Sequence, residues 1–167
     1  MNEVIKTEDI KNRIFTIRGL QVMIDSDLAE MYGVETKNLN LAVKRNIDRF
    51  PDFFRFQLTE KEYKSLRLQI ETSKEKRGGR RYMPYAFTEQ GVAMLSAVLR
   101  SKTAVKVSIQ IMQAFVDMKK FISLNAGVFQ RLEQIETKQI ETDQKFEQLF
   151  NALQSNEITP KQNIFCY

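Results

Sequence analysis

The 167-residue sequence contains no histidine and only one cysteine, Cys166. Without histidine the chain cannot form a Ser/His/Asp or Cys/His nucleophile system, bind zinc through imidazole, or use the usual general base of neutral pH. A single cysteine also excludes a disulfide framework and a cysteine metal cluster. No apolar run approaches the ~18 residues of a membrane helix. We therefore expect a cytoplasmic protein that needs no metal or cofactor and has no membrane partner.

Signatures of enzyme chemistry are equally scarce. No paired carboxylates stand out, and Gly78-Gly79 lacks both the spacing and the Lys-Ser/Thr ending of a P-loop. We expect no enzymatic activity, and a metal-dependent nuclease built from Asp and Glu is the remaining enzymatic alternative. Charge is unevenly distributed, because residues 1–123 carry 22 Lys and Arg against 15 Asp and Glu, whereas residues 124–167 carry 4 against 6. The basic part is the candidate for contact with a polyanion.

Residues 25–46 have the pattern of a helix-turn-helix, an element typical of DNA-binding proteins. Leu28 and Tyr32 lie one helical turn apart and would bury the first helix, with the small Ala29 where the two helices cross. Gly33 can adopt the left-handed conformation that ends a helix. The second helix begins at about residue 36 and would be buried through Val34, Leu39 and Ala42.

The outward face of this second helix combines hydrogen-bonding and cationic side chains suited to base edges and phosphates: Thr36, Lys37, Asn40, Lys44 and Arg45. Within this set, we expect Asn40 to read a base through its amide. The alternative is two packed helices with a solvated polar face.

Short β-prone runs surround the helix pair. Residues 14–17 and 20–24, separated by Arg18-Gly19, predict a hairpin, and residues 54–58 alternate as a half-buried strand does. Residues 82–87 could pair with that strand, although Pro84 would then need an edge position. Whether the hairpin joins the same sheet stays open. Candidate N-caps of the first helix are Asp25, Ser26 and Asp27, with Glu30 completing a capping box.

Three further helices are predicted. Thr59 and Glu62 form a capping box ahead of a short helix over residues 60–70. Helices over residues 89–100 and 102–124 follow, and Asn125-Ala-Gly127 ends the second. The buried stripe of the first is Val92, Leu95 and Leu99, and that of the second is Val105, Ile109, Met112, Val116 and Phe121.

The segment of residues 71–81 has no apolar side chain and is rich in turn formers, which predicts an exposed loop. Between two strands, such a loop could form a basic wing that follows phosphates or enters a minor groove. The alternative is a solvated loop. Its candidate DNA contacts are Lys74, Lys76, Arg77, Arg80 and Arg81.

Residues 128–153 alternate spacings of four and three, as the seam of a coiled coil does. Gln139 and Thr142 are polar positions in its middle, which would cost stability and fix register. We expect this helix to pair two chains through Val128, Leu132, Ile135, Phe146, Leu149 and Leu153. The alternative is a single amphipathic helix that folds back on the domain.

Several ordered blocks, above all Arg80-Arg-Tyr-Met-Pro-Tyr-Ala-Phe-Thr-Glu-Gln-Gly-Val-Ala-Met-Leu-Ser96, carry a family resemblance. With Asp25–Val34 and Val43–Pro51, they resemble the phage open-reading-frame-six N-terminal domain, a family related to KilA-N and Bro-N domains. The resemblance covers roughly residues 10–122. It implies a DNA-binding module of phages, prophages and bacterial hosts, often fused to C-terminal domains and sometimes found in antirepressor-like proteins.

Together these observations predict an α+β protein: a winged helix-turn-helix-like domain with a small antiparallel sheet, then core helices and a C-terminal coiled-coil helix. The expected divisions are residues 1–123, residues 124–154, and a tail at residues 155–167 that leads toward a missing domain. The expected function is sequence-selective binding of double-stranded DNA by a homodimer at the bacterial nucleoid, in phage, prophage or mobile-element regulation. The alternative is an antirepressor module that sequesters a repressor protein.

Overall fold

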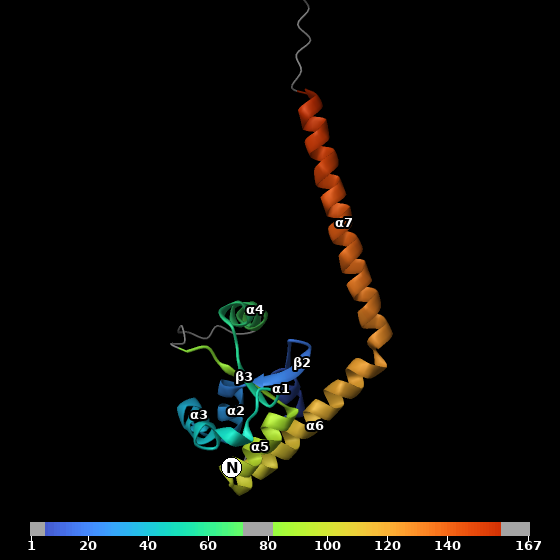
Figure 1. Ribbon diagram of the computed structural model, residues 1–167. Coiled ribbons are helices and arrows are strands. Elements are labelled where there is room, and N and C mark those ends of the chain that lie inside the picture. The colour runs from blue at the N-terminus through green and yellow to red at the C-terminus, as the bar shows by residue number, and fades with distance from the viewer. Residues whose placement is uncertain (1–5, 72–81, 158–167) are drawn as a thin grey trace, which may run out of the picture. The chain divides into compact units, whose positions relative to one another are not determined.

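The computed structural model describes residues 6–71 and 82–157 (Figure 1). Backbone contacts divide the chain into two units, Met1–Lys120 and Phe121–Tyr167. The elements are, in order, α1 (Thr7–Lys11), β1 (Phe15–Ile17), β2 (Leu20–Ile24), α2 (Asp25–Tyr32), α3 (Thr36–Arg45), the 3-10 turn η1 (Ile47–Arg49), β3 (Arg55–Gln57), α4 (Glu60–Glu71), β4 (Tyr85–Thr88), α5 (Glu89–Leu99), α6 (Lys102–Leu124) and α7 (Ala126–Glu157). The described part of the chain is therefore α+β, with a small antiparallel sheet and a long C-terminal helix.

The first two strands form the predicted hairpin. Arg18 and Gly19 both have positive φ, at 54° and 72°, and Ile17 pairs with Leu20 across them. Two consecutive residues with positive φ are typical of the type I′ turn, whose twist matches that of the flanking strands. The glycine satisfies this requirement without strain, whereas Arg18 adopts the left-handed region at some cost.

The hairpin also joins the rest of the sheet. The strand order is β1-β2-β4-β3 and every pair is antiparallel. This order places β4 inside the sheet, so the edge position expected for Pro84 is wrong. Pro84 lies one residue before β4, where it needs no ladder hydrogen bond of its own, and its carbonyl accepts the Leu58 N–H at 3.0 Å.

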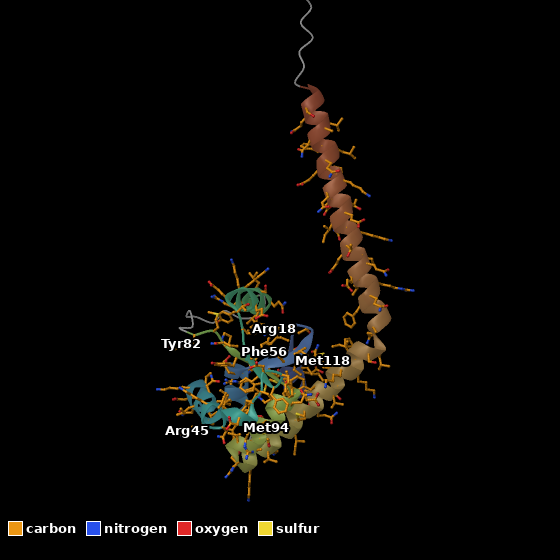
Figure 2. The ribbon with its side chains drawn as sticks, in the orientation of Figure 1. Arg18, Arg45, Phe56, Tyr82, Met94 and Met118 are labelled. Atoms are coloured by element: carbon orange, nitrogen blue, oxygen red, sulfur yellow. The ribbon has the colours of Figure 1, made fainter. Side chains whose placement is uncertain are left out.

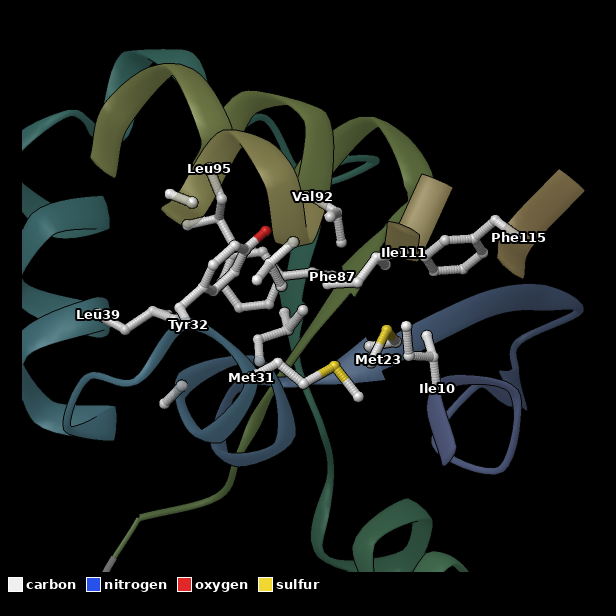
Figure 3. Close-up of a cluster of buried hydrophobic side chains, with 14 of the residues drawn as sticks. Ile10, Met23, Met31, Tyr32, Leu39, Phe87, Val92, Leu95, Ile111 and Phe115 are labelled. Atoms are coloured by element: carbon white, nitrogen blue, oxygen red, sulfur yellow. The ribbon is translucent and has the colours of Figure 1, made fainter. Parts of the chain in front are cut away.

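The two faces of the sheet bury different cores. Met23 and Phe87 point into the larger core with α2, α5 and α6, and their strand neighbours Val22 and Ala86 point into a smaller core under α4. This alternation follows from the two-residue period of a strand. Figure 3 shows side chains of the larger core, including Tyr32, Phe87, Leu95 and Phe115.

The helix pair α2–α3 has the predicted turn, and α3 begins at residue 36 as predicted. Gly33 is left-handed (φ 68°) and its successor Val34 donates its N–H to the Ala29 carbonyl at 2.9 Å. Leu28, Ala29, Tyr32 and Leu39 are buried as expected. The prediction for Val34 is wrong, because it lies in the turn with 37% of its surface exposed, and Val43 fills the core one turn after Leu39 instead. Ala42 is half-buried.

The predicted capping box of α2 is also wrong. Ile24 is the N-cap residue and no side chain caps the helix, because the chain enters α2 directly from β2. Asp27 and Glu30 instead form ion pairs with Arg13 at 3.7 and 3.0 Å. At α4, by contrast, the capping box is present: Thr59 N–H donates to Glu62 Oε2 at 2.8 Å, and Glu62 N–H donates to Thr59 Oγ1 at 3.2 Å.

The stripe predicted to bury α6 faces outward, and this prediction is wrong. Val105, Ile109, Val116 and Phe121 are exposed, and Met112 is only partly buried. The helix has a second apolar stripe that contains small residues, and these allow a closer approach to the core. That stripe is buried, and Ser108 on it forms a 2.8 Å hydrogen bond with the Tyr32 hydroxyl. Its members are Ala104, Val107, Ser108, Ile111, Ala114 and Phe115.

The second unit is built on α7. Asn125 separates α6 from α7: its side chain donates to the Phe121 carbonyl at 2.8 Å, and its own carbonyl accepts the Val128 and Phe129 N–H groups. The six apolar residues predicted to pair two chains all lie on α7 and are exposed. In the described ranges, no helix combines the length and apolarity needed to cross a bilayer.

Candidate nucleic-acid interface

The outer face of α3 carries the residues predicted to contact DNA. Lys37, Lys44 and Arg45 are exposed, and Thr36 and Asn40 are half-buried. None of the three cations forms an ion pair with another described residue. In Figure 2, Arg45 projects from the α3 side of the first unit. The cationic side chains of α3 are therefore available to an external anion.

The first half of α3 borders a groove with a volume of about 510 Å³. Its opposite wall comes from the end of β3 and from the residues that lead into β4. The groove thus joins the predicted recognition helix to the sheet. It is lined by Asp25, Thr36, Lys37, Asn40, Gln57, Tyr82, Met83 and Tyr85.

A buried carboxylate ties the walls of the groove together. Asp25 is 2% exposed, and its Oδ2 accepts the Asn40 side-chain N–H at 2.8 Å and the Tyr85 backbone N–H at 3.3 Å. Since these residues belong to α2, α3 and β4, one carboxylate connects three elements. A hydrogen bond to a charged group contributes more stability than a neutral one.

This contact changes the interpretation of Asn40. A bidentate contact with adenine uses both the oxygen and the nitrogen of the amide. Here the nitrogen donates to Asp25, and Oδ1 is buried without a hydrogen-bond partner among the described residues. In this conformation Asp25 orients Asn40 through one of its two amide hydrogens, and the reading of a base by Asn40 stays a prediction.

Arg55 packs against Tyr85, one of the residues that line the groove. The Arg55 guanidinium stacks on the Tyr85 ring at 3.9 Å, as in a cation–π contact. Burial lowers the pKa of Arg55, and nearby Tyr85 and Asp25 oppose this change. Arginine keeps its charge even so, because its ordinary pKa lies far above neutral pH. The charge therefore helps to balance the buried Asp25.

The helix dipole explains the positive charges at one end of α3 and not at the other. Lys44 and Arg45 occupy the last turn, where cations stabilise a helix. Lys37 occupies the first turn, next to the positive end of the dipole, where a cation is unfavourable. Helix stability therefore does not account for the exposed charge of Lys37.

Sequence reasoning missed five groove residues. It treated Asp25 only as a helix cap, whereas Gln57, Tyr82, Met83 and Tyr85 reach α3 only through the pairing of β3 with β4. Tyr82, labelled in Figure 2, follows directly after the basic segment. The candidate contacts Lys74, Lys76, Arg77, Arg80 and Arg81 lie outside the described residues.

Comparison with known families identifies this unit. A family model described as the ORF6N domain matches residues 12–98, more than half of the chain. The chain belongs to the ORF6N domain family. This family is phage-associated and similar to KilA-N. The ORF6N match contains every residue that lines the groove and excludes α6 and α7. No curated protein and no solved structure matches the chain.

In the part of the ORF6N protein that the structure describes, no group of three or more Asp, Glu or Cys side chains is arranged to hold a metal ion. The described side chains of the groove offer hydrogen bonding, aromatic contact and the positive charge of Lys37. These groups can bind an anionic polymer.

Proposed function

We propose that this ORF6N protein binds double-stranded DNA sequence-selectively in phage, prophage or mobile-element regulation, at the nucleoid of a bacterial cytoplasm. The interface is α3 together with the basic segment that leads to Tyr82. The observation that carries the proposal is the groove, in which the first half of α3 faces the start of β4 and Tyr82, the residue that follows that segment in the sequence. The protein acts as a binding module without catalytic chemistry.

The roles on α3 follow from position and charge. Thr36 and Lys37 open the helix and line the groove, so they are the candidates to contact base edges and the adjacent phosphate. Lys44 and Arg45 are exposed at its other end and suit phosphate contacts. Asn40 is a positioning residue that fixes α3 against Asp25.

Binding of the full chain to a labelled duplex of random sequence, measured by fluorescence anisotropy over a range of salt concentrations, tests the proposal. Affinity should fall linearly on logarithmic axes as salt rises. Lys37→Gln should reduce that slope by ~0.9, the value expected for one lost phosphate contact. Lys61→Gln is the matched control, because Lys61 is an exposed cation beside a different cavity, between α4 and the β1–β2 hairpin.

Three results would contradict the proposal. Equal slopes for the two lysine variants would remove the start of α3 from the interface. Binding of a repressor protein that does not depend on salt, without DNA binding, would support the antirepressor alternative. Cleavage of the duplex in the presence of magnesium would support the nuclease alternative.

A further inference from the structure

The apolar seam of α7 has no partner within its own unit. α7 runs without interruption from Ala126 to Glu157, and the second unit has no other described element apart from the end of α6. Every large apolar residue on its seam is exposed. A helix of this kind gains most of its stability by covering that face. We therefore expect another apolar surface to pack against the seam.

The spacing of the seam residues defines the heptad positions of α7. Position a is occupied by Leu132, Gln139, Phe146 and Leu153, and position d by Val128, Ile135, Thr142 and Leu149. Gln139 and Thr142 form a polar layer in the middle. A shift of one helix along the other would place these side chains against apolar ones, so the layer favours an arrangement in which the polar layers of the two helices meet.

The charges beside the seam are sorted by sign. Arg131, Lys138 and Lys145 are the basic residues of α7, and all three occupy position g. The charged residues at position e are Glu136 and Asp143, which are both acidic. Positions g and e flank the core of a coiled coil and set the orientation of its helices.

Contacts within one helix account for only part of this pattern, because Lys138 and Lys145 lie three and four residues from Glu141. Arg131, Glu136 and Asp143 have no opposite charge three or four residues away, where side chains of a helix meet. Glu136 lies three residues from Glu133, and Asp143 lies four residues from Glu147, so each faces a like charge. Such neighbours destabilise an isolated helix.

We infer that α7 pairs with α7 of a second copy of this chain, parallel and in register. In that arrangement each g residue meets the e residue five positions further along the other helix. Arg131 then faces the partner's Glu136, and Lys138 faces the partner's Asp143. An antiparallel pair would instead oppose g with g and e with e, and every charged contact would be repulsive. Charge complementarity therefore selects the parallel pair.

Parallel pairing bears on DNA recognition. Each Met1–Lys120 unit is joined to the N-terminal end of α7, so a parallel pair attaches both units at one end of the coil. Two identical binding units held by a two-fold axis suit a palindromic DNA site, and their linkage raises avidity. This last step rests on the proposed function, whereas the pairing of α7 does not.

A charge-swapped chain tests the orientation: Arg131→Glu and Lys138→Glu with Glu136→Lys and Asp143→Lys. In a parallel pair, the swapped chain pairs with itself and rejects the wild type, because unlike charges meet only between identical chains. In an antiparallel pair, the swapped chain prefers the wild type. Co-purification of differently tagged full chains after mixing distinguishes the two results, and a mixed pair would overturn the inference.

A second measurement tests the pairing itself. Light scattering of the wild-type chain should give the mass of two copies, and a monomeric mass would overturn the inference. Reversing only position e, with Glu136→Lys and Asp143→Lys, should raise the dissociation constant about 10-fold or more. The control reverses Glu133 and Glu147 at position b, with the same change in net charge and little effect on pairing. None of these measurements uses DNA, so failure of the pairing and failure of DNA binding are distinguishable.

Discussion

Replacing Asn40 by aspartate should make the stability of this protein depend on pH in a specific direction. Asn40 Nδ2 lies 2.8 Å from Asp25 Oδ2, and Asp25 is almost fully buried. In Asn40→Asp two carboxyl groups occupy that contact, and both cannot ionise at so short a distance. One proton is then shared by the pair, as an O–H donor that replaces the lost N–H.

The magnitude follows from proton linkage. The pair's upper pKa in the folded variant lies above the ~3.9 of an unfolded aspartate. The folded state then binds more protons, so the added stability is present at low pH and is lost as pH rises. The loss is about 1.4 kcal/mol for each pH unit between the unfolded pKa and the upper folded pKa of the pair.

Urea unfolding of the variant at pH 5 and pH 7, each compared with wild type, measures this difference. Asn38→Asp is the matched control, because Asn38 is an exposed residue on the same helix. Its side chain forms no hydrogen bond with another described residue that the substitution would remove. If Asn40→Asp and Asn38→Asp show the same pH dependence, then Asp25 does not hold Asn40 and the account of the groove is wrong.

Two other substitutions test the structure. The hydrogen bonds that Glu62 accepts from Arg18 and Thr59 lower its pKa to about 2, so its contribution of about 1 kcal/mol should disappear as pH falls from ~4 toward 2. Glu62→Gln should flatten the acid limb of the stability curve in urea titrations, and an unchanged limb would refute the assignment. A Cβ on Gly91 would overlap the Phe54 carbonyl, so Gly91→Ala should lower the free energy of unfolding by about 1–3 kcal/mol. In Gly127→Ala, where a Cβ meets nothing within 4 Å, no such loss is expected, and equal urea midpoints for the two variants would count against the packing of α5.

Features set by neighbouring residues could be predicted from the sequence. The turn at Arg18-Gly19, the left-handed stop at Gly33 and the capping box of Thr59 and Glu62 all have the predicted form. In each case the residue that determines the local structure lies within three residues of the turn or helix end that it shapes. The family could also be recognised, because its blocks are contiguous stretches of sequence.

Features set by distant packing could not be predicted. α6 offers two apolar stripes, and only the shape of the core selects the one with Ala104 and Ser108. Aspartate is a residue type that often caps helices, but the hydrogen-bond partners of Asp25, Asn40 and Tyr85, lie 15 and 60 residues away. The groove wall at Gln57 and Tyr82 depends on the order of the strands, which no local pattern contains.

The position of β4 has a consequence for synthesis on the ribosome. β2 and β3 flank β4 in the sheet, and Val22 pairs with Thr88, so the strands made early have no central neighbour until β4 emerges. Pairing of segments so distant in sequence is slow and leaves apolar surface open in the meantime. Met23 and Leu39 cannot be buried in the larger core until Phe87 and the helices that follow it have been synthesised. A nascent chain that ends before β4 therefore displays α3 without the core that supports it, and chaperones are expected to engage this protein during that interval.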